Sequence, residues 1–341
     1  MNPLSILQIA ELSGAKLEQG DGKTLIERIS TDSRTIKKGE LFVALRGENF
    51  DGHKFVEATA KAGAAGAIVD LKWNGKVPGK FVIIRAEDTL LAYQNLAANY
   101  RKALSLKVLA ITGSNGKTST KDFAASVLGR KFRVAKTQGN FNNHVGLPRT
   151  ILEARSDDEV AVWEIGMNHP GEVAPLAKIA APDAAIVTNI GVAHMEFMGT
   201  REAIAKEKGA LAEAVAAEGT VILNGDDPFS KGIAERTDAH VIFAGTKEGT
   251  VRAIDIQQSA DGSEFTIMED AHRCRAQLPV PGLHMVQNAL LAVAAGRAFG
   301  LLSKKRPPVS PARPSLKRVY RSKRSTASSF SMIATTRIPI R

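Results

Sequence analysis

The sequence has very little cysteine and no long hydrophobic run. Both features exclude whole classes of protein. Cys274 is the single cysteine among 341 residues, which excludes an internal disulfide framework and a cysteine-ligated zinc site. No apolar run reaches the ~18 residues that a membrane span needs. The first twenty residues lack a basic segment and a long apolar core, so we expect no secretory signal. These absences predict a cytoplasmic protein.

Acidic residues are missing from the end of the chain. Residues 303–341 contain 11 of the 46 Lys and Arg residues and none of the 35 Asp and Glu residues. The preceding residues are balanced in charge, so the net charge of +11 does not mark the body of the protein as a nucleic-acid-binding one. The Ser-, Pro- and Arg-rich tail is typical of disorder, and a nucleic-acid-binding tail is the functional alternative. We expect no nucleic-acid partner.

The body of the chain has enough apolar residues for a sizeable core, with 44% hydrophobic residues, and its length suggests about two domains. Apolar strand patterns alternate with helical ones, which predicts an α/β fold with a mainly parallel sheet. The expected strands are 107–112, 160–165, 184–190, 220–224 and 240–244, and then 251–256, 264–268 and 273–280, which could pair antiparallel. The expected helices are 89–101, 118–128, 201–217 and 286–299.

A smaller α/β unit precedes this sheet. It has its own strand signal at 40–44 and helix signal at 53–62, and the helix at 89–101 joins the two units. We therefore divide the chain into domains at 1–85 and 86–302, followed by the tail at 303–341.

The sharpest motif follows the strand at 107–112 and opens the helix at 118–128. It consists of Thr112, Gly113, Ser114, Asn115, Gly116, Lys117, Thr118 and Ser119. Glycines let backbone N–H groups approach phosphate oxygens, and a helix N-terminus adds partial positive charge. The lysine can neutralise phosphate charge and the threonine can ligate Mg²⁺. The motif predicts an ATP-binding loop. The alternative is a Gly/Asn turn with a surface lysine, because Ile111 stands where the strict pattern has its first glycine.

This loop resembles the ATP loop of the Mur ligases, which add amino acids to the muramoyl peptide of bacterial cell-wall precursors. Further stretches are similar to that family in order and spacing over about residues 20–300. They are TDSR at 31–34, GELFVAL at 39–45, GENFDGH at 47–53, GNFNNHVGLP at 139–148, EIGMNHPGE at 164–172, TNIGVAHME at 188–196 and REAIAKEKGAL at 201–211. The sequences of 139–148 and 164–172 are most similar to those of the family branch that adds D-alanyl-D-alanine.

The resemblance implies a metal and catalytic site. Glu164 and His194 match the family's metal-binding carboxylate and histidine. Lys208 matches a lysine that CO₂ can carbamylate, which turns the cation into a carboxylate able to ligate a second Mg²⁺. Lys206 is the weaker candidate for that lysine. Lys117 completes the catalytic set. From the residues alone, Glu164 could instead cap a helix, His194 could be structural, and both lysines could be solvated.

The resemblance also implies substrate and nucleotide contacts. Asn142, Asn143 and His144 match a stretch that holds the substrate diphosphate, although the same amides could form only a polar turn. Ser33 and Arg34 lie in the stretch that resembles the uridine-nucleotide-binding domain. Asn288 matches an ATP-binding asparagine within GLHMVQN, where Met285 replaces another asparagine that is usual in the family.

The implied reaction is ATP-dependent amide formation with Mg²⁺. ATP phosphorylates the terminal carboxylate of UDP-N-acetylmuramoyl-tripeptide, and D-alanyl-D-alanine attacks the acyl phosphate. Residues 1–85 then form the small UDP-substrate-binding α/β domain, and residues 86–302 form the central P-loop domain of a protein that we expect to be a monomer.

The family's third domain has no counterpart here, because the resemblance ends near Leu302. One allowed codon choice for FSMIATTRIPIR at 330–341, read two bases later, gives LNDCYNSNPDP, which is similar to the D-Y-N-A-N-P segment of that domain. We interpret the tail as frameshifted and expect impaired ligase activity. The alternatives are a ligase that adds the third amino acid, a nucleotide- or UDP-precursor-binding remnant, and a generic P-loop ATPase or kinase.

Overall fold

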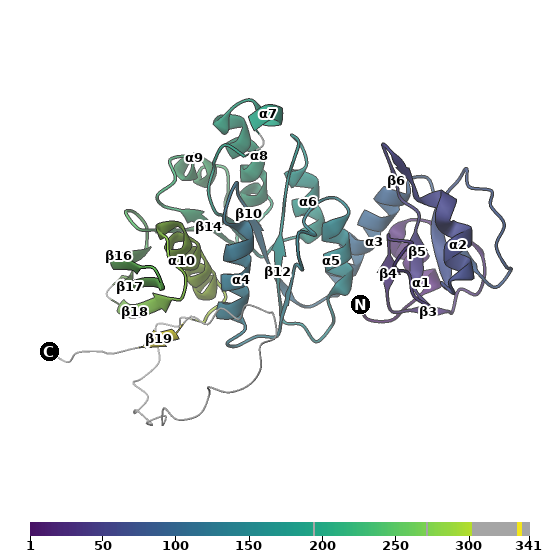
Figure 1. Ribbon diagram of the computed structural model, residues 1–341, viewed down its shortest axis with the longest axis horizontal. Helices are drawn as coiled ribbons and strands as arrows, with labels where there is room; N and C mark the ends of the chain where they lie inside the picture. The colour runs from purple at the N-terminus through teal and green to yellow at the C-terminus, as the bar shows by residue number, and fades with distance from the viewer. Residues whose placement is uncertain (194, 271, 302–332, 336–341) are drawn as a thin grey trace, which may run out of the picture.

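The computed structural model describes residues 1–193, 195–270, 272–301 and 333–335. Two main sheets organise them, a five-stranded one in the first 86 residues and a ten-stranded one that begins at Lys107 (Figure 1), and the first 86 residues also contain two short two-stranded sheets. The larger sheet occupies the centre of the molecule and the smaller unit lies at one end. In the described part of the chain, no helix combines the length and the apolar character that crossing a bilayer requires.

The smaller unit is built on a five-stranded sheet in the order β2-β9-β8-β5-β4. Its strands β4, β5, β8 and β9 run parallel, and β2 pairs antiparallel at the edge. The strands of this unit are β1 Leu4–Ser5, β2 Lys16–Gln19, β3 Leu25–Ile26, β4 Ile29–Ser30, β5 Leu41–Val43, β6 Arg46–Gly47, β7 Phe50–Asp51, β8 Gly66–Asp70 and β9 Val82–Ala86. Its helices are α1 Ile6–Ser13, the 3₁₀ helix η1 Gly52–Phe55 and α2 Val56–Lys61.

The larger sheet has the order β11-β12-β10-β13-β14-β15-β16-β17-β18-β19. Parallel pairing runs from β11 to β16, and antiparallel pairing joins β16 to β19. The strands are β10 Lys107–Thr112, β11 Val134–Lys136, β12 Val160–Glu164, β13 Ala184–Val187, β14 Thr220–Asn224, β15 His240–Gly245, β16 Val251–Ser259, β17 Gly262–Glu269, β18 His272–Leu278 and β19 Ile333–Thr335. The mainly parallel α/β fold is confirmed.

Helices cover both faces of this sheet. They are α3 Thr89–Ala103, α4 Lys117–Leu128, α5 Gly146–Glu153, α6 Val173–Ala180, α7 Met195–Met198, α8 Arg201–Glu213, α9 Ser230–Ala234 and α10 Leu283–Ala298. Side chains alternate across a strand, and in β10 Val108 and Ala110 belong to the cluster of α5, α6 and α8, whereas Leu109 and Ile111 belong to that of α4 and α10. A strand buried on both faces reads as a continuous apolar run, and KVLAIT is such a run.

Strand β13 is shorter than its sequence pattern. The apolar stretch predicts a strand over 184–190, but the strand ends at Val187. The backbone N–H of Thr188 bonds to Thr112 O, and that of Ile190 donates to the Asp227 carboxylate at 2.7 Å. The Thr188 bond still belongs to the β10–β13 ladder. The chain turns away from the ladder at Asn189, whose carbonyl accepts from Ser114 N–H of the phosphate loop, and at Ile190. The expected disorder of 303–341 falls mostly outside the described residues.

Helix α3 joins the two sheets. It packs on α1 of the smaller unit and on α5 and α6 of the larger one. At its end the buried Arg101 donates to Ala180 O at 3.1 Å, to Ala181 O at 3.2 Å and to the Asp183 carboxylate at 3.3 Å. One guanidinium thus fixes the end of α3 to the loop before β13.

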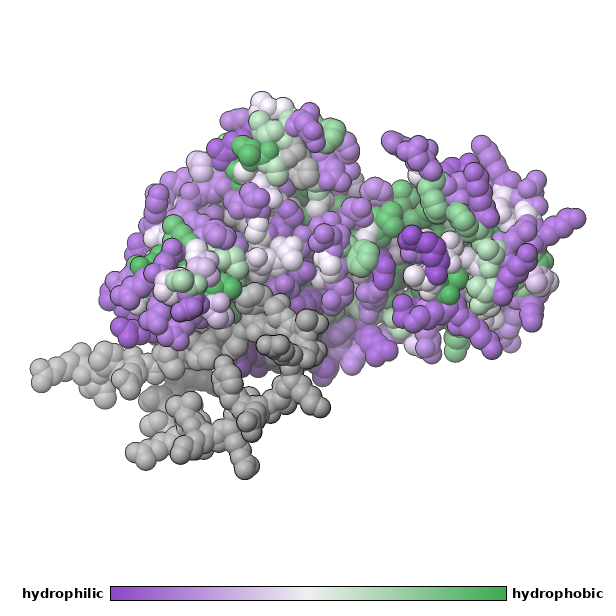
Figure 2. Space-filling view, viewed as in Figure 1, coloured by the Kyte–Doolittle hydropathy of each residue, from purple (hydrophilic) through white to green (hydrophobic). Residues whose placement is uncertain are grey.

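Figure 2 shows that hydrophilic side chains cover much of the visible face. A hydrophobic area appears around α7, where Phe197 is 49% exposed. Its ring packs edge-on against His169 with 4.4 Å between ring centroids.

Arg101→Met should lower the free energy of unfolding by about 3 kcal/mol, because it leaves buried carbonyl groups without donors. Urea denaturation measures the change. Lys102→Met on the same helix is the control, since Lys102 is exposed and its replacement should cost less than about 0.5 kcal/mol. Equal losses in the two variants would show that Arg101 does not anchor α3.

Candidate functional site

The predicted phosphate loop lies where the strand order of the larger sheet changes direction. Strand β10 is flanked by β12 on one side and by β13 on the other, so the carboxyl ends of three parallel strands meet at one edge. Such a position is where open α/β sheets bind ligands. The loop at 113–116 follows β10, Glu164 ends β12, and Thr188 follows β13.

Two glycines of the loop are required by close contacts. Gly113 has φ 147°, and a Cβ there would lie 1.9 Å from Thr188 Oγ1. Gly116 has φ 78°, and a Cβ there would lie 2.4 Å from Asn288 Oδ1. Asn288, on α10, is therefore placed against the loop, as the sequence analysis implied.

The segment after β13 fixes the loop. Ser114 N–H donates to Asn189 O at 2.9 Å, and Asn115 N–H donates to Asn189 Oδ1 at 3.0 Å. The Thr188 hydroxyl donates to Asn115 O at 2.6 Å. The loop is thus held in shape by protein contacts.

The loop has the features of an anion site. Helix α4 begins at Lys117, and its N-cap Gly116 offers no side chain to the first-turn N–H groups, which include those of Thr118 and Ser119. Thr112 Oγ1 and Ser114 Oγ are buried, and neither has a hydrogen-bond partner in the described part of the chain. Buried hydroxyls without partners cost free energy, so a ligand that bonds to them would be stabilising.

Lys117 folds over the loop. Its ammonium donates to Gly113 O at 2.8 Å and to Ser114 O at 3.3 Å. Burial lowers the pKa of Lys117, and the charge of Glu164 opposes that shift.

Glu164 is buried at the edge of the sheet, with 2% of its surface exposed. Its Oε2 accepts from the Thr118 hydroxyl at 3.0 Å, and its Oε1 accepts from the Asn142 amide at 2.8 Å. Its backbone N–H donates to Thr137 Oγ1 at 2.9 Å. The predicted neighbours Thr118 and Glu164 are therefore in direct contact, which makes two oxygen ligands available for one hard cation.

Lys208 of α8 is buried, and the charge of Lys117 acts on its ammonium. Lys208 is 1% exposed, whereas Lys206 on the same helix is exposed. Burial and then the charge of Lys117 lower the pKa of Lys208 to about 7, and Glu207 opposes this shift. Of the two lysines that the sequence left open, Lys208 is the buried one.

The three polar residues before α5 have separate surroundings. Asn142 contacts Glu164 as above. Asn143 accepts with Oδ1 from Val145 N–H at 3.2 Å and Gly146 N–H at 2.8 Å, so it caps the start of α5. His144 is exposed, and its carbonyl accepts from Gln94 of α3 at 3.1 Å. Their role as substrate ligands stays a prediction.

Ser33 and Arg34 lie on the smaller unit, in a turn after β4. Asp32 accepts from Arg34 Nε at 2.9 Å and Nη2 at 2.8 Å. These bonds lower the pKa of Asp32 to about 2. Arg149 of α5 also acts on that carboxylate, which places the turn toward the larger unit.

His194 lies outside the described residues, so its predicted metal role stays a prediction. Within the described ranges no group of three or more His, Cys, Asp and Glu side chains is placed to hold a metal ion. A cation at Thr118 and Glu164 would therefore depend on further ligands from elsewhere, such as phosphate oxygens or water.

Asp226 is a polar hub that the sequence reasoning did not identify. Its carboxylate accepts from Thr246 N–H at 2.7 Å, Lys247 N–H at 2.8 Å and the Gln287 amide at 2.9 Å. Burial alone would raise the pKa of Asp226, but these bonds lower it below its ordinary value. Since Gln287 precedes Asn288 on α10, Asp226 helps to place Asn288 beside the loop. The signal in the sequence was the polar stretch NGDDP at 224–228, which begins at the last residue of β14.

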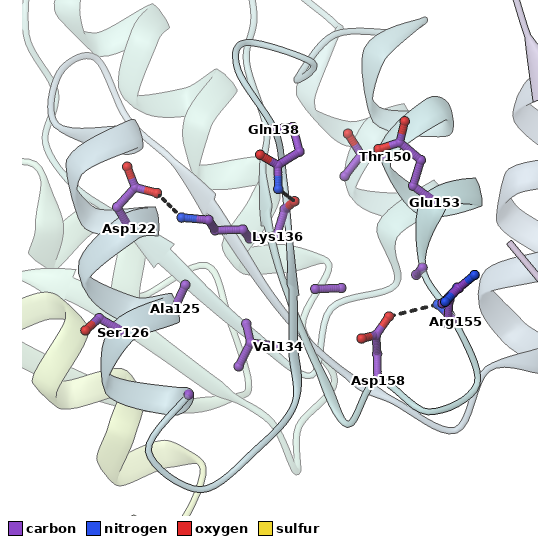
Figure 3. A pocket seen from close by; sticks show the side chains of 13 residues that line it. Asp122, Ala125, Ser126, Val134, Lys136, Gln138, Thr150, Glu153, Arg155 and Asp158 are labelled. Atoms are coloured by element: carbon purple, nitrogen blue, oxygen red, sulfur yellow. Dashed lines mark hydrogen bonds and ion pairs between the residues drawn. The ribbon is translucent and has the colours of Figure 1, made fainter. Parts of the chain in front are cut away.

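A cavity of about 870 Å³ lies elsewhere, beside the edge strand β11 (Figure 3). Residues of α4, β11 and α5 line it, and Lys136 and Asp122 pair across it at 2.8 Å. None of the predicted site residues lines this cavity, so it is separate from the phosphate loop.

Comparisons with known proteins agree with this geometry. Residues 111–296 match the Mur ligase middle domain, and residues 25–101 match the Mur ligase family catalytic domain. The chain is 41% identical over 282 residues to a UDP-N-acetylmuramoyl-tripeptide--D-alanyl-D-alanine ligase of Bacillus subtilis, covering 82% of this chain and 60% of that one.

Two solved structures are similar. The crystal structure of MurF from Acinetobacter baumannii matches with a TM-score of 0.82 and 34% identity over 88% of this chain and 66% of that one. The MurF ligase of Thermotoga maritima in complex with ADP matches with a TM-score of 0.72 and 29% identity over 80% of this chain and 63% of that one. The chain thus spans less than two thirds of the length of these relatives.

Lys208→Met should remove a pH dependence of stability. The pKa of Lys208 is about 7 in the folded chain against 10.5 ordinarily. Between these values the unfolded chain holds one more proton, so wild-type stability rises with pH, and the penalty for burying the ammonium is complete below about pH 7. The stability of Lys208→Met relative to wild type should fall by about 1.4 kcal/mol per pH unit from pH 7 to 9.

Urea unfolding at pH 7, 8 and 9 in bicarbonate-free buffer measures this difference. Lys206→Met is the matched control, because the exposed Lys206 carries no burial penalty, and that variant should follow the wild-type pH dependence. A pH-independent difference between Lys208→Met and wild type would refute the assigned environment of Lys208.

Proposed function

Because this chain belongs to the Mur ligase family, we propose that it acts in the reaction that joins D-alanyl-D-alanine to UDP-N-acetylmuramoyl-tripeptide. For this reaction it would bind ATP and a UDP-linked precursor. The observation that carries the proposal is the contact of the phosphate loop and the start of α4 with a buried carboxylate, where Thr118 donates to Glu164. The names of the Bacillus and Acinetobacter relatives support the D-alanyl-D-alanine-adding reaction.

The residues of the loop fit the phosphates of ATP. The uncapped start of α4 and the unpartnered hydroxyls of Thr112 and Ser114 offer donors to phosphate oxygens. Lys117 would turn from the loop carbonyls to the phosphates, because a bond from the ammonium to a negatively charged oxygen is stronger than one to a neutral carbonyl. Asn288 would lie beside the bound nucleotide. The Thermotoga relative, named as an ADP complex, supports this use of the loop.

Thr118 and Glu164 fit Mg²⁺, since hydroxyl and carboxylate oxygens are its usual protein ligands. When bound, the ion would act as a Lewis acid that offsets phosphate charge. We propose His194 and a carbamylated Lys208 as further ligands. The lowered pKa of Lys208 leaves a share of its amine neutral near pH 7, and only the neutral amine attacks CO₂.

The smaller unit would hold the uridine nucleotide. We propose that residues 1–85 form this domain, with Ser33 and Arg34 in contact with the substrate, and that 86–302 form the ATP-binding domain, with Asn142, Asn143 and His144 near the diphosphate. The turn at Asp32 lies toward Arg149 of the larger unit, so one extended substrate could contact both. The need for ATP supports a cytoplasmic location, and we propose a monomer.

A second candidate is nucleotide and precursor binding without ligase turnover. One observation favours it: the chain spans only 60% of the length of the Bacillus relative. Whether this chain alone catalyses ligation must therefore be measured separately from binding. The reaction itself would proceed mainly by positioning the reactants and offsetting charge on the transferred phosphoryl group with Lys117 and Mg²⁺.

Two measurements distinguish these functions. Calorimetry should show tighter binding of UDP-N-acetylmuramoyl-tripeptide than of UDP or of the dipeptide precursor, whereas a ligase for the third amino acid would prefer the dipeptide precursor. Phosphate release from ATP should require the tripeptide precursor and increase with D-alanyl-D-alanine if the chain turns over. A generic ATPase would release phosphate without the precursor, and that result would contradict the proposal.

Lys117→Ala should weaken ATP binding by at least about tenfold, because a charge-assisted phosphate contact is worth more than ~1.4 kcal/mol. Calorimetry with Mg²⁺ measures the change. Lys131→Ala is the control: Lys131 is an exposed lysine beyond the other end of α4, far along the chain from the loop, and its replacement should leave the affinity unchanged. Equal ATP affinity in Lys117→Ala and wild type would contradict the loop assignment.

A further inference from the structure

Two opposite charges are buried together beneath the phosphate loop. The side chains of Lys121 and Glu164 are 3% and 2% exposed, and Lys121 Nζ lies 4.0 Å from Glu164 Oε2. A lysine is almost never buried this fully without a partner, and removing one member of a buried pair leaves an uncompensated charge. The function proposed above assigns no role to Lys121.

Lys121 reaches Glu164 from the same helix face as the loop residues. It follows Thr118 by three positions and Lys117 by four, a spacing that puts the three side chains on one side of α4. Glu164 Oε2 is therefore shared by the Thr118 hydroxyl at 3.0 Å and the Lys121 ammonium. Asn142 holds Oε1, so both carboxylate oxygens are engaged.

This arrangement affects any cation that binds to Thr118 and Glu164. Mg²⁺ or Mn²⁺ needs oxygen ligands at about 2.1 Å, which would bring it within roughly 4–6 Å of the Lys121 ammonium. At an effective dielectric of about 20, repulsion between such charges weakens binding by more than tenfold. The negative charge of a triphosphate would offset this repulsion.

We propose that Lys121 is a positioning residue that holds the Glu164 carboxylate in place and keeps a lone divalent cation off it, so that metal enters only with the phosphates of a nucleotide. The inference rests on the proposed function, because it takes a metal–nucleotide complex as the ligand of the loop. Lys121 touches neither substrate nor metal and acts through Glu164.

Binding of Mn²⁺ to the nucleotide-free full chain, followed by electron paramagnetic resonance, tests the proposal. Lys121→Met and Lys121→Gln should bind Mn²⁺ at least about tenfold more tightly than wild type. Lys121→Arg keeps the charge and should bind it as weakly as wild type. Lys136→Met is the matched control, since Lys136 pairs with the partly exposed Asp122 of α4 (Figure 3) and its replacement should change the affinity less than twofold.

Affinity for free Mn²⁺ that is unchanged, weaker or unmeasurable in folded Lys121→Met and Lys121→Gln would overturn the proposal. Wild type is also titrated with Mn²⁺ and a non-hydrolysable ATP analogue. If wild type does not bind that complex, the proposed function fails. If it does and the variants gain no affinity for free Mn²⁺, only the role of Lys121 fails.

The paired charges provide a second test if the single variants do not fold. Lys121→Met combined with Glu164→Gln removes both buried charges and should fold, with a thermal midpoint above that of either single variant. A double variant that is no more stable than Lys121→Met would show that Lys121 is not the counter-charge of Glu164, and the proposal would fall.

Discussion

The buried carboxylate of Glu164 is the constraint on which the site depends. A charge removed from water costs several kcal/mol unless it is paired and hydrogen-bonded. Side chains from several segments pair with this carboxylate or hydrogen-bond to its residue. Thr118 and Lys121 come from α4, Asn142 from the loop before α5, and Thr137 orients the backbone at the end of β12. Each segment must be in place before the charge is satisfied, so the carboxylate ties the geometry of the loop to that of the sheet edge.

The strand order brings these segments together. Because β10 lies between β12 and β13, the loop after β10 is flanked by the ends of both neighbours. Thr188 and Asn189 close it from the β13 side, and Asn288 on α10 lies over Gly116. Asp226 connects α10 to the loop after β15. The loop is thus preorganised by the segment after β13 and by α10, which Asp226 in turn holds in place.

Sequence reasoning located the loop, its flanking strand and helix, and the parallel sheet, because apolar runs, glycines and a helix start are local signals. It also favoured Lys208 over Lys206, and burial agrees with that choice. It did not find the pairing of Lys121 with Glu164 or the hub at Asp226. Spacing shows that Lys121 shares a helix face with Thr118, but the charge opposite that face comes from a strand more than forty residues away. Likewise the sequence predicted that residues 188–190 continue the strand, but contacts of Asn189 and Ile190 with two distant loops end it at Val187.

Helix α3 has a consequence for the cooperativity of the whole chain. One continuous cluster of buried side chains includes Ile9 of α1, Leu96 of α3 and Ala161 of β12, and so runs through both sheets. Independent domains unfold in separate steps only when few contacts cross between them. Here the shared cluster couples the two units, so that strain or mutation in the smaller sheet lowers the melting temperature of the larger one. Calorimetric unfolding of residues 1–301 would then appear as a single transition.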